Sequence, residues 1–268
     1  MGRSKVPESP FFPTIPRLLH RIGHMVRAAL GYALFRARRV GRGHSDALAA
    51  DLNARLRGYP RNHNYRLDAG RLVPCFRLYE RAVAVARRYP RPLESFLDIG
   101  CCRGYYVMDA ARRLGCPVAV GIDVHEPFVS TAQDVSRRLG LARTAFHLAT
   151  LDEVARQPEA YGGPFQTILL IGTYHYLFWG SELSPKAYHG HREILCRLAG
   201  LSTDRVVFSA RLEVARLPAR LRHKAAAFGS EPPYTRAGFA EAAREWFAIE
   251  QAGWLGRDPL LVMHRKGA

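Results

Sequence analysis

Beyond residue 92 the chain alternates short apolar runs with amphipathic stretches of helical spacing. In the stretches between the runs, apolar residues recur every three or four positions, which is the period of a helix packed on a core. This alternation predicts an α/β domain whose mainly parallel sheet carries helices on both faces. The predicted strands are Ser95–Ile99, Pro117–Ile122, Ala145–Leu148, Thr167–Ile171 and Arg205–Ser209, and the predicted helices are Tyr105–Leu114, Pro127–Leu139, Leu151–Gln157 and Pro185–Leu198.

The C-terminal part departs from simple alternation. A helix capped by Thr235 precedes two strands, Ala248–Gly253 and Pro259–His264, which follow each other closely. A connection this short permits a hairpin but not a parallel crossover. The pattern therefore predicts a doubly wound, seven-stranded, mostly parallel sheet with an antiparallel C-terminal strand.

The first 92 residues have a different character and are predicted to form a basic, helical extension or cap on a catalytic domain at 93–268. They hold 19 Lys or Arg against 5 Asp or Glu, a net charge of +14, whereas the remainder carries only +3 of the total +17. Helices are expected at 14–34, at about 45–56 and near Arg71–Arg88, with the turn-rich segment Gly58–Arg66 between the last two.

The helix predicted at 14–34 is amphipathic and basic. Its apolar stripe either packs on the protein's own core or lies on an anionic membrane surface, and its arginines could instead contact nucleic acid or another partner. The stripe comprises Ile15, Leu18, Leu19, Ile22, Met25, Val26, Leu30 and Leu34.

The cysteine spacing and the hydropathy of the sequence argue against a disulfide-bonded, zinc-binding or membrane-spanning protein. The five cysteines include no Cys-x-x-Cys pair, which argues against a disulfide framework and a structural zinc site, so no metal is predicted. No apolar run approaches the roughly 18 residues that span a bilayer. We expect a cytoplasmic protein, peripheral on the inner membrane face if the N-terminal helix binds lipid.

The sharpest local motif joins the first predicted strand to its helix as Asp98-Ile99-Gly100-Cys101-Cys102-Arg103-Gly104. Glycines there let the backbone approach a ligand, and the helix presents free N–H groups. A dinucleotide fingerprint needs glycines where Cys102 and Tyr105 stand, and no Gly-Lys-Ser/Thr follows for a P-loop. Asp123 ends the second strand 19 residues after Gly104, where a carboxylate can accept both hydroxyls of a ribose.

With these features, residues 95–268 resemble the class I S-adenosylmethionine (SAM)-dependent methyltransferase family, whose acidic-x-Gly-x-Gly-x-Gly loop matches except at Cys102. The resemblance implies a Rossmann-like fold with SAM as the cofactor, held by the loop, by Asp123 at the ribose and by the tip of the third strand at the adenine. Many members carry an acid at that tip, where this chain has Thr150, with Asp152 two residues later. The implied cofactor-binding residues are Asp98, Gly100, Cys101, Gly104, Asp123, Val124, Thr150, Leu151, Ile171 and Gly172.

The fourth strand continues into Gly172-Thr173-Tyr174-His175, and in the family this edge faces the transferred methyl group. The run is similar to a Gly-x-x-His segment of several subfamilies, including a tRNA wobble-uridine methyltransferase family and some glycan O-methyltransferases. His175 is the first candidate for a catalytic base, because histidine titrates near neutral pH. It could instead be a structural histidine among aromatic residues, and His189 and His191 are weaker candidates.

Two further features near the predicted site each have two possible interpretations. The aromatic residues around His175 line either an acceptor pocket or the core. Arg66 either meets the methionine carboxylate or an anionic acceptor, or lies in a solvated loop.

Three functions remain open from the sequence. The first is methyl transfer to a hydroxyl of a small molecule or glycan, at a membrane surface if the N-terminal helix binds there. The alternative is a tRNA or other RNA methyltransferase whose basic N-terminal region holds phosphates. The third is a non-enzymatic, SAM-binding partner subunit, which the departures at Cys102 and Thr150 allow and the intact acids and glycines oppose.

Overall fold

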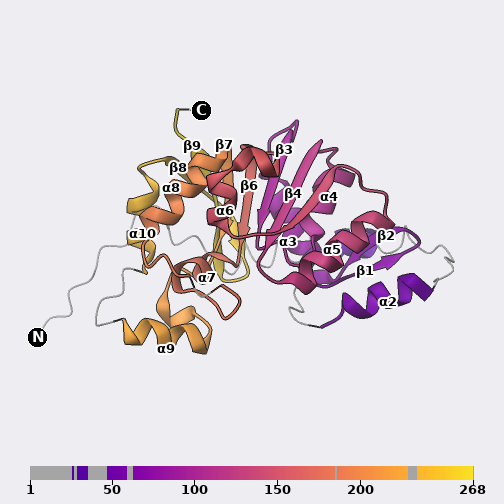
Figure 1. Cartoon of the computed structure of the whole chain (residues 1–268), viewed down its shortest axis with the longest axis horizontal. Coiled ribbons are helices and arrows are strands. Elements are labelled where there is room, and N and C mark those ends of the chain that lie inside the picture. Colours follow the sequence, from indigo (N-terminus) through magenta and orange to yellow (C-terminus); the bar gives the residue numbers. More distant parts are fainter. Residues whose placement is uncertain are drawn as a thin grey trace, which may run out of the picture.

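A seven-stranded sheet forms the centre of the computed structural model, which describes residues 26, 29–35, 47–58, 63–184, 186–228 and 234–267. The strand order is β5-β4-β3-β6-β7-β9-β8 (Figure 1). All pairs are parallel except those of β9, which runs antiparallel to both β7 and β8, as the sequence predicts. The strands are β3 (Ser95–Ile99), β4 (Val118–Asp123), β5 (Thr144–Leu148), β6 (Phe165–Ile171), β7 (Ser202–Ser209), β8 (Phe247–Leu255) and β9 (Asp258–Arg265).

Successive strand residues point to opposite faces of the sheet and enter two hydrophobic clusters. Leu97 and Ile99 of β3 join the cluster under α6, α7, α8 and α10, whereas Phe96 joins the cluster under α3, α4 and α5 (Figure 1). Both faces are thus buried, which is why the central strands are nearly continuously apolar. These helices are α3 (Phe76–Ala86), α4 (Tyr105–Arg113), α5 (Glu126–Arg138), α6 (Leu151–Arg156), α7 (Tyr174–Trp179), α8 (His191–Leu201) and α10 (Arg236–Ala243).

The segment before β3 packs on the second of these faces. Helix α2 (Ala47–Arg55) buries Leu52 in the same cluster as α4 and α5, and Arg55 pairs with Asp134 of α5 at 2.6 Å. The helix expected at Arg71–Arg88 is wrong in its first part, where β2 (Arg71–Pro74) pairs with β1 (Tyr65–Asp68). Ala69 and Gly70 both have positive φ and form the two-residue turn of this hairpin, a weaker sequence signal than Asn-Gly.

The described part of the first predicted helix, residues 29–35, is helical and docks through its aromatic side chains. The Tyr32 hydroxyl donates to the carbonyl oxygen of Pro74 at 3.1 Å, and its ring meets that of Phe76 edge-on. The described members of the predicted apolar stripe are not the docking face, because Val26, Leu30 and Leu34 are 53%, 62% and 59% exposed. The rest of the stripe, Ile15–Met25, lies outside the described residues, as does residue 45, where the second predicted helix begins.

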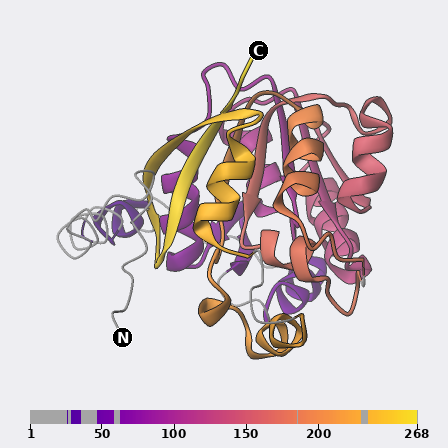
Figure 2. The ribbon, with the colours of Figure 1, turned by 90° about the vertical axis from the view of Figure 1, so that its left-hand side faces the viewer.

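The greatest departure from the sequence prediction lies after β6. Helix α8 begins at His191 rather than Pro185, because Gly190 is extended and residues 180–190 form a loop, of which residue 185 is not described. Two short helices were not predicted, α7 and α9 (Ala219–Ala227), and α9 lies below the body of the sheet (Figure 2). Within the described residues, no helix is both long and apolar enough to cross a bilayer.

Candidate functional site

A cavity of about 1140 Å³ opens where the parallel strands end. Ligands of open α/β sheets bind beyond the carboxyl ends of the strands, where neighbouring connections leave to opposite faces. Here β3 and β6 are neighbours whose following helices, α4 and α7, lie on opposite faces. The strand ends that line the cavity are Ile99 and Gly100, Ile122 and Asp123, Ile171 and Gly172, and Ser209.

The loop after β3 is bent by residues in the left-handed conformation. Gly100 has φ 77°, and a Cβ there would overlap the side chain of Thr173, so only glycine fits. Cys102 adopts the same region with φ 52°, which is uncommon for a residue with a side chain. The N–H groups of Gly100 and Cys101 both donate to the carbonyl oxygen of Ile122, at 2.8 and 2.9 Å, which fixes the loop against β4.

Asp123, at the end of β4, lines the cavity beside this loop. Its Oδ2 accepts the backbone N–H of Cys102 and its Oδ1 that of His125, both at 2.9 Å. Burial raises the pKa of Asp123, while the hydrogen bonds from Cys102 and His125 oppose that shift. The carboxylate is therefore held in a fixed orientation at the cavity edge.

Asp98 is buried beneath the loop. Asp98, Cys101 and Gly104, three of the predicted cofactor-binding residues, do not line the cavity. Burial, and then the nearby charge of Asp123, raise the pKa of Asp98 well above its usual range. Its Oδ2 has no hydrogen-bond partner among the described residues. Charging a buried carboxyl group without a partner is costly, so the fold favours the neutral acid at Asp98.

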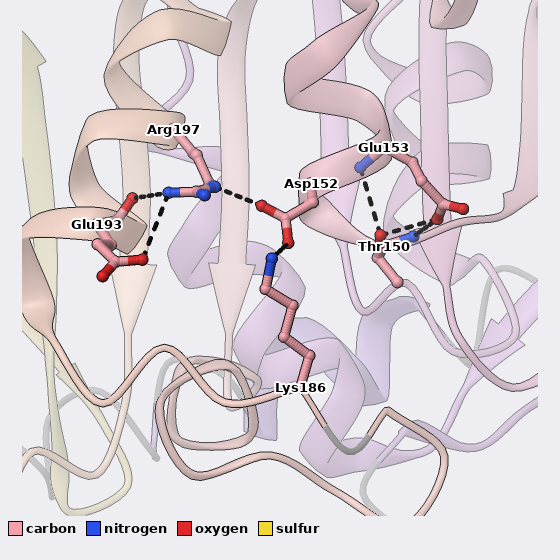
Figure 3. A network of polar contacts seen from close by, with 6 residues as sticks. All are labelled: Thr150, Asp152, Glu153, Lys186, Glu193 and Arg197. Carbon is pink, nitrogen blue, oxygen red and sulfur yellow. Dashed lines mark hydrogen bonds and ion pairs between the residues drawn. The ribbon is translucent and has the colours of Figure 1, made fainter.

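Thr150 and Leu151, which follow β5, both line the cavity. The Thr150 side chain, however, already has a structural role. It caps α6 in a reciprocal capping box with Glu153. The carboxylate of Asp152 also lines the cavity, yet it is held by Lys186 and, at 2.5 Å, by Arg197 (Figure 3). Neither side chain is left free to recognise an adenine amino group, so backbone groups are the remaining donors and acceptors at this tip.

His175 lies on α7 rather than at a strand edge, because Gly172 with φ 71° ends the strand and the chain turns into the helix. It is buried, lines the cavity, and its Nδ1 has no partner among the described residues. Burial and then the charge of Arg211 lower the pKa of His175 to about 3. The imidazole is therefore neutral at pH 7 and able to accept a proton or a hydrogen bond.

The alternative histidines do not line the cavity. His191 is buried, with its Nδ1 2.7 Å from the Tyr174 hydroxyl, and the ring of His189 stacks on Phe228. Of the aromatic residues around His175, only Tyr176 lines the cavity, and Tyr174, Phe178 and Trp179 are core residues. Most of the aromatic residues around His175 thus belong to the hydrophobic core and not to an acceptor pocket.

Several cavity residues were not predicted. Arg66 is exposed, pairs with Asp68 and lies away from this cavity, whereas Arg81 of α3 and His63 both line it, with 3.5 Å between Nη1 and Nε2. Arg211 lies two residues beyond β7, a position that the predicted strand end could have suggested. Among the described residues, no cluster of three or more His, Cys, Asp or Glu side chains could hold a metal ion.

Comparison with known proteins supports the fold. No protein-family model and no curated protein matches this sequence. Among solved structures, EvdMO1 matches with 16% identity and a TM-score of 0.52 over 84% of this chain and 49% of its own. WbdD, described as a bifunctional kinase-methyltransferase, matches with 18% identity and a TM-score of 0.51 over 69% of this chain. Magnesium protoporphyrin IX methyltransferase from Synechocystis PCC 6803 with bound SAH has 14% identity and a TM-score of 0.48 over 92% of this chain and 99% of its own.

The matched part of this chain spans 35% of WbdD, and about half of EvdMO1, so the likeness concerns one domain of larger proteins. Sheet order, the antiparallel β9, the glycine loop after β3 and the acid that ends β4 all occur together in this domain. The chain has the Rossmann-like fold of the class I SAM-dependent methyltransferases.

Proposed function

We propose that this protein is a SAM-dependent methyltransferase that transfers the methyl group to a hydroxyl of a small molecule or glycan. The observation that carries the proposal is the hydrogen bond between Asp123 and the glycine loop at the edge of the large cavity. This hydrogen bond holds Asp123, the carboxylate that would bind the ribose, next to the loop that would face the methionine part of the cofactor. The cavity also exceeds the volume that one drug-sized ligand needs, which leaves space for an acceptor beside the cofactor.

The residues present fit the cofactor. Asp123 would hold the ribose hydroxyls, the loop from Gly100 to Cys102 would face the methionine part, and Thr150 with Leu151 would face the adenine. A Cβ added to Gly172 would have no other atom within 4 Å. The cavity wall is therefore open at Gly172, where the methyl group is expected. When bound, SAM supplies an electrophilic methyl group on a sulfonium.

The catalytic work of the chain is then positioning and proton removal. His175, neutral and lining the same cavity, accepts the proton of the acceptor hydroxyl. SAM would supply the methyl group to the acceptor oxygen and keep the electron pair of the carbon–sulfur bond on its sulfur, while the proton of the hydroxyl would go to His175. Leu177 and Leu221 line the cavity as well and exclude water from this step.

Calorimetric titration of the purified chain with SAM tests the proposal. We expect wild type to bind SAM, and Asp123→Asn to bind at least about tenfold more weakly, because hydrogen bonds to a charged group contribute about 1.5–3 kcal/mol. Asp204→Asn is the matched control, since Asp204 lies on β7, is partly exposed and does not line the cavity. Absence of SAM binding in the wild type would refute the proposed function.

The N-terminal helix extends this proposal to a membrane surface. Val26, Leu30 and Leu34 form an exposed apolar stripe, spaced four residues apart, on the helix that docks through Tyr32. The sequence around them is strongly basic. An apolar stripe flanked by arginines suits an anionic lipid surface, which would bring the cavity to a membrane-borne acceptor.

A further inference from the structure

Most charged side chains that line the cavity have an ion-pair or hydrogen-bond partner within the protein. Lys186 is held by Asp152, and Arg220 by Glu182. Asp258 pairs with Arg216 at 2.7 Å. Asp123 is held by backbone N–H groups.

Arg211 differs from these residues. It follows β7, lines the cavity and is half-buried, yet its guanidinium has no ion pair or hydrogen bond within the part of the chain that the structure describes. Only its backbone carbonyl is engaged, by the hydroxyl of the buried Tyr234. That contact fixes the backbone from which the side chain extends.

The charge of Arg211 acts directly on the proposed base. Among the described residues, burial and then the charge of Arg211 lower the pKa of His175. Both residues line the same cavity, and a half-buried guanidinium there attracts an anion more strongly than one in bulk water. Arg81, the other cavity-lining cation outside these ion pairs, contacts His63 instead.

We propose that the methyl acceptor carries an anionic oxyacid group, a phosphate or a carboxylate, which Arg211 binds beside the hydroxyl that is methylated. The inference rests on the proposed function and adds the substrate class. Guanidinium binds such oxygens through two parallel N–H donors, so it would fix orientation as well as position. The bound anion would also offset the Arg211 charge, which after burial is the second cause of the lowered pKa of His175, and would thereby raise that pKa.

The test uses the full chain loaded with SAH and follows the imidazole resonance of His175 by NMR, assigned by its loss in His175→Gln. Methyl phosphate and acetate are titrated separately into wild type, Arg211→Gln and Arg222→Gln. Arg222 is the matched control, because it is exposed on α9 and does not line the cavity. SAH affinity and melting temperature are measured for each variant, so that loss of fold is recognised.

We expect one probe to shift the His175 resonance in wild type and Arg222→Gln, with binding at least about tenfold weaker in Arg211→Gln. Tighter methyl phosphate binding indicates a phosphate-bearing acceptor, and tighter acetate binding a carboxylate-bearing one. If neither probe shifts the resonance, or if Arg211→Gln responds like wild type, the inference is wrong while the proposed function stands. Failure of wild type to bind SAH overturns both.

Discussion

The backbone N–H of Cys102 donates to Oδ2 of Asp123 across 2.9 Å, joining the loop after β3 to the end of β4. Cys102 makes this bond while it adopts φ 52°, a conformation that costs about 1 kcal/mol for a residue with a Cβ. The chain thus keeps the loop geometry at a position where the family motif has glycine. The orientation of Asp123, the residue proposed to bind the ribose, is consequently coupled to the shape of the loop.

Gly172→Ala tests whether the open space at the end of β6 belongs to the cofactor site. Alanine at φ 71° should lower the free energy of unfolding by about 1 kcal/mol, and its Cβ should enter the cavity and weaken SAM binding. Gly115→Ala is the matched control, with φ 72°, open surroundings and no place in the cavity wall. Equal SAM affinity in both variants would show that the space is not used.

Asp98→Asn should stabilise the ligand-free protein increasingly as pH rises above about 4, the range in which an unburied carboxyl group loses its proton. The pKa of Asp98 is raised above the ordinary 3.8, so above that pH the folded state retains a proton that the unfolded state releases. Wild-type stability therefore falls as pH rises through this range, and the amide removes that loss. Melting temperatures of both proteins across the range measure the effect, and a difference independent of pH would contradict it.

His175→Gln should reduce kcat for acceptor methylation by about 100-fold or more, while SAM affinity stays unchanged, because general-base catalysis contributes about 10²–10⁴-fold. Its stability should also depend differently on pH. Burial and then Arg211 lower the pKa of His175 from 6.5 to about 3, so wild type loses stability as pH falls from about 6.5.

The glutamine variant lacks this acid-side loss, and denaturant unfolding between pH 7 and pH 4 measures the difference. A kcat equal to that of wild type would leave His175 as a structural residue only.

Lys186→Met should loosen the loop at 181–188, which lines the cavity and is tied to Asp152 by this ion pair (Figure 3). Because Lys186 is largely exposed and Asp152 keeps Arg197, global stability should change by less than about 1 kcal/mol. Hydrogen exchange of the loop should nevertheless accelerate relative to wild type. Lys266→Met, at an exposed lysine outside the cavity wall, is the control and should leave the loop's exchange unchanged.

Leu30→Gln with Leu34→Gln should weaken binding to vesicles of mixed phosphatidylserine and phosphatidylcholine by about tenfold or more, since each buried methylene contributes roughly 0.8 kcal/mol. Ala29→Gln with Ala33→Gln is the control, because both alanines are exposed on the same helix outside the stripe. Sedimentation with the vesicles measures binding. Wild type that ignores the vesicles but binds tRNA with a steep salt dependence would favour the nucleic-acid alternative.

The sheet was predictable because each central strand is a short apolar run bounded by turn residues, and β3 matches its predicted bounds in full. The late hairpin followed from the length of its connection alone. The β1–β2 hairpin was missed because its turn, Ala69-Gly70, lacks the residues that usually mark such turns. Helix α7 was missed because its six residues are aromatic or apolar apart from His175, and such a short run carries no period that separates strand from helix.

The sequence by itself determined the seven strands of the large sheet, the glycine loop and the acid that ends β4, because these depend on local spacing and on the carboxyl ends of parallel strands meeting at one edge. Only the tertiary structure decided which other charges reach the cavity: Arg81 does and Arg66 does not, and Arg211 reaches it without an ion pair among the described residues. Such placements depend on how distant elements pack, and side-chain burial and pairing are properties of that packing rather than of any local pattern.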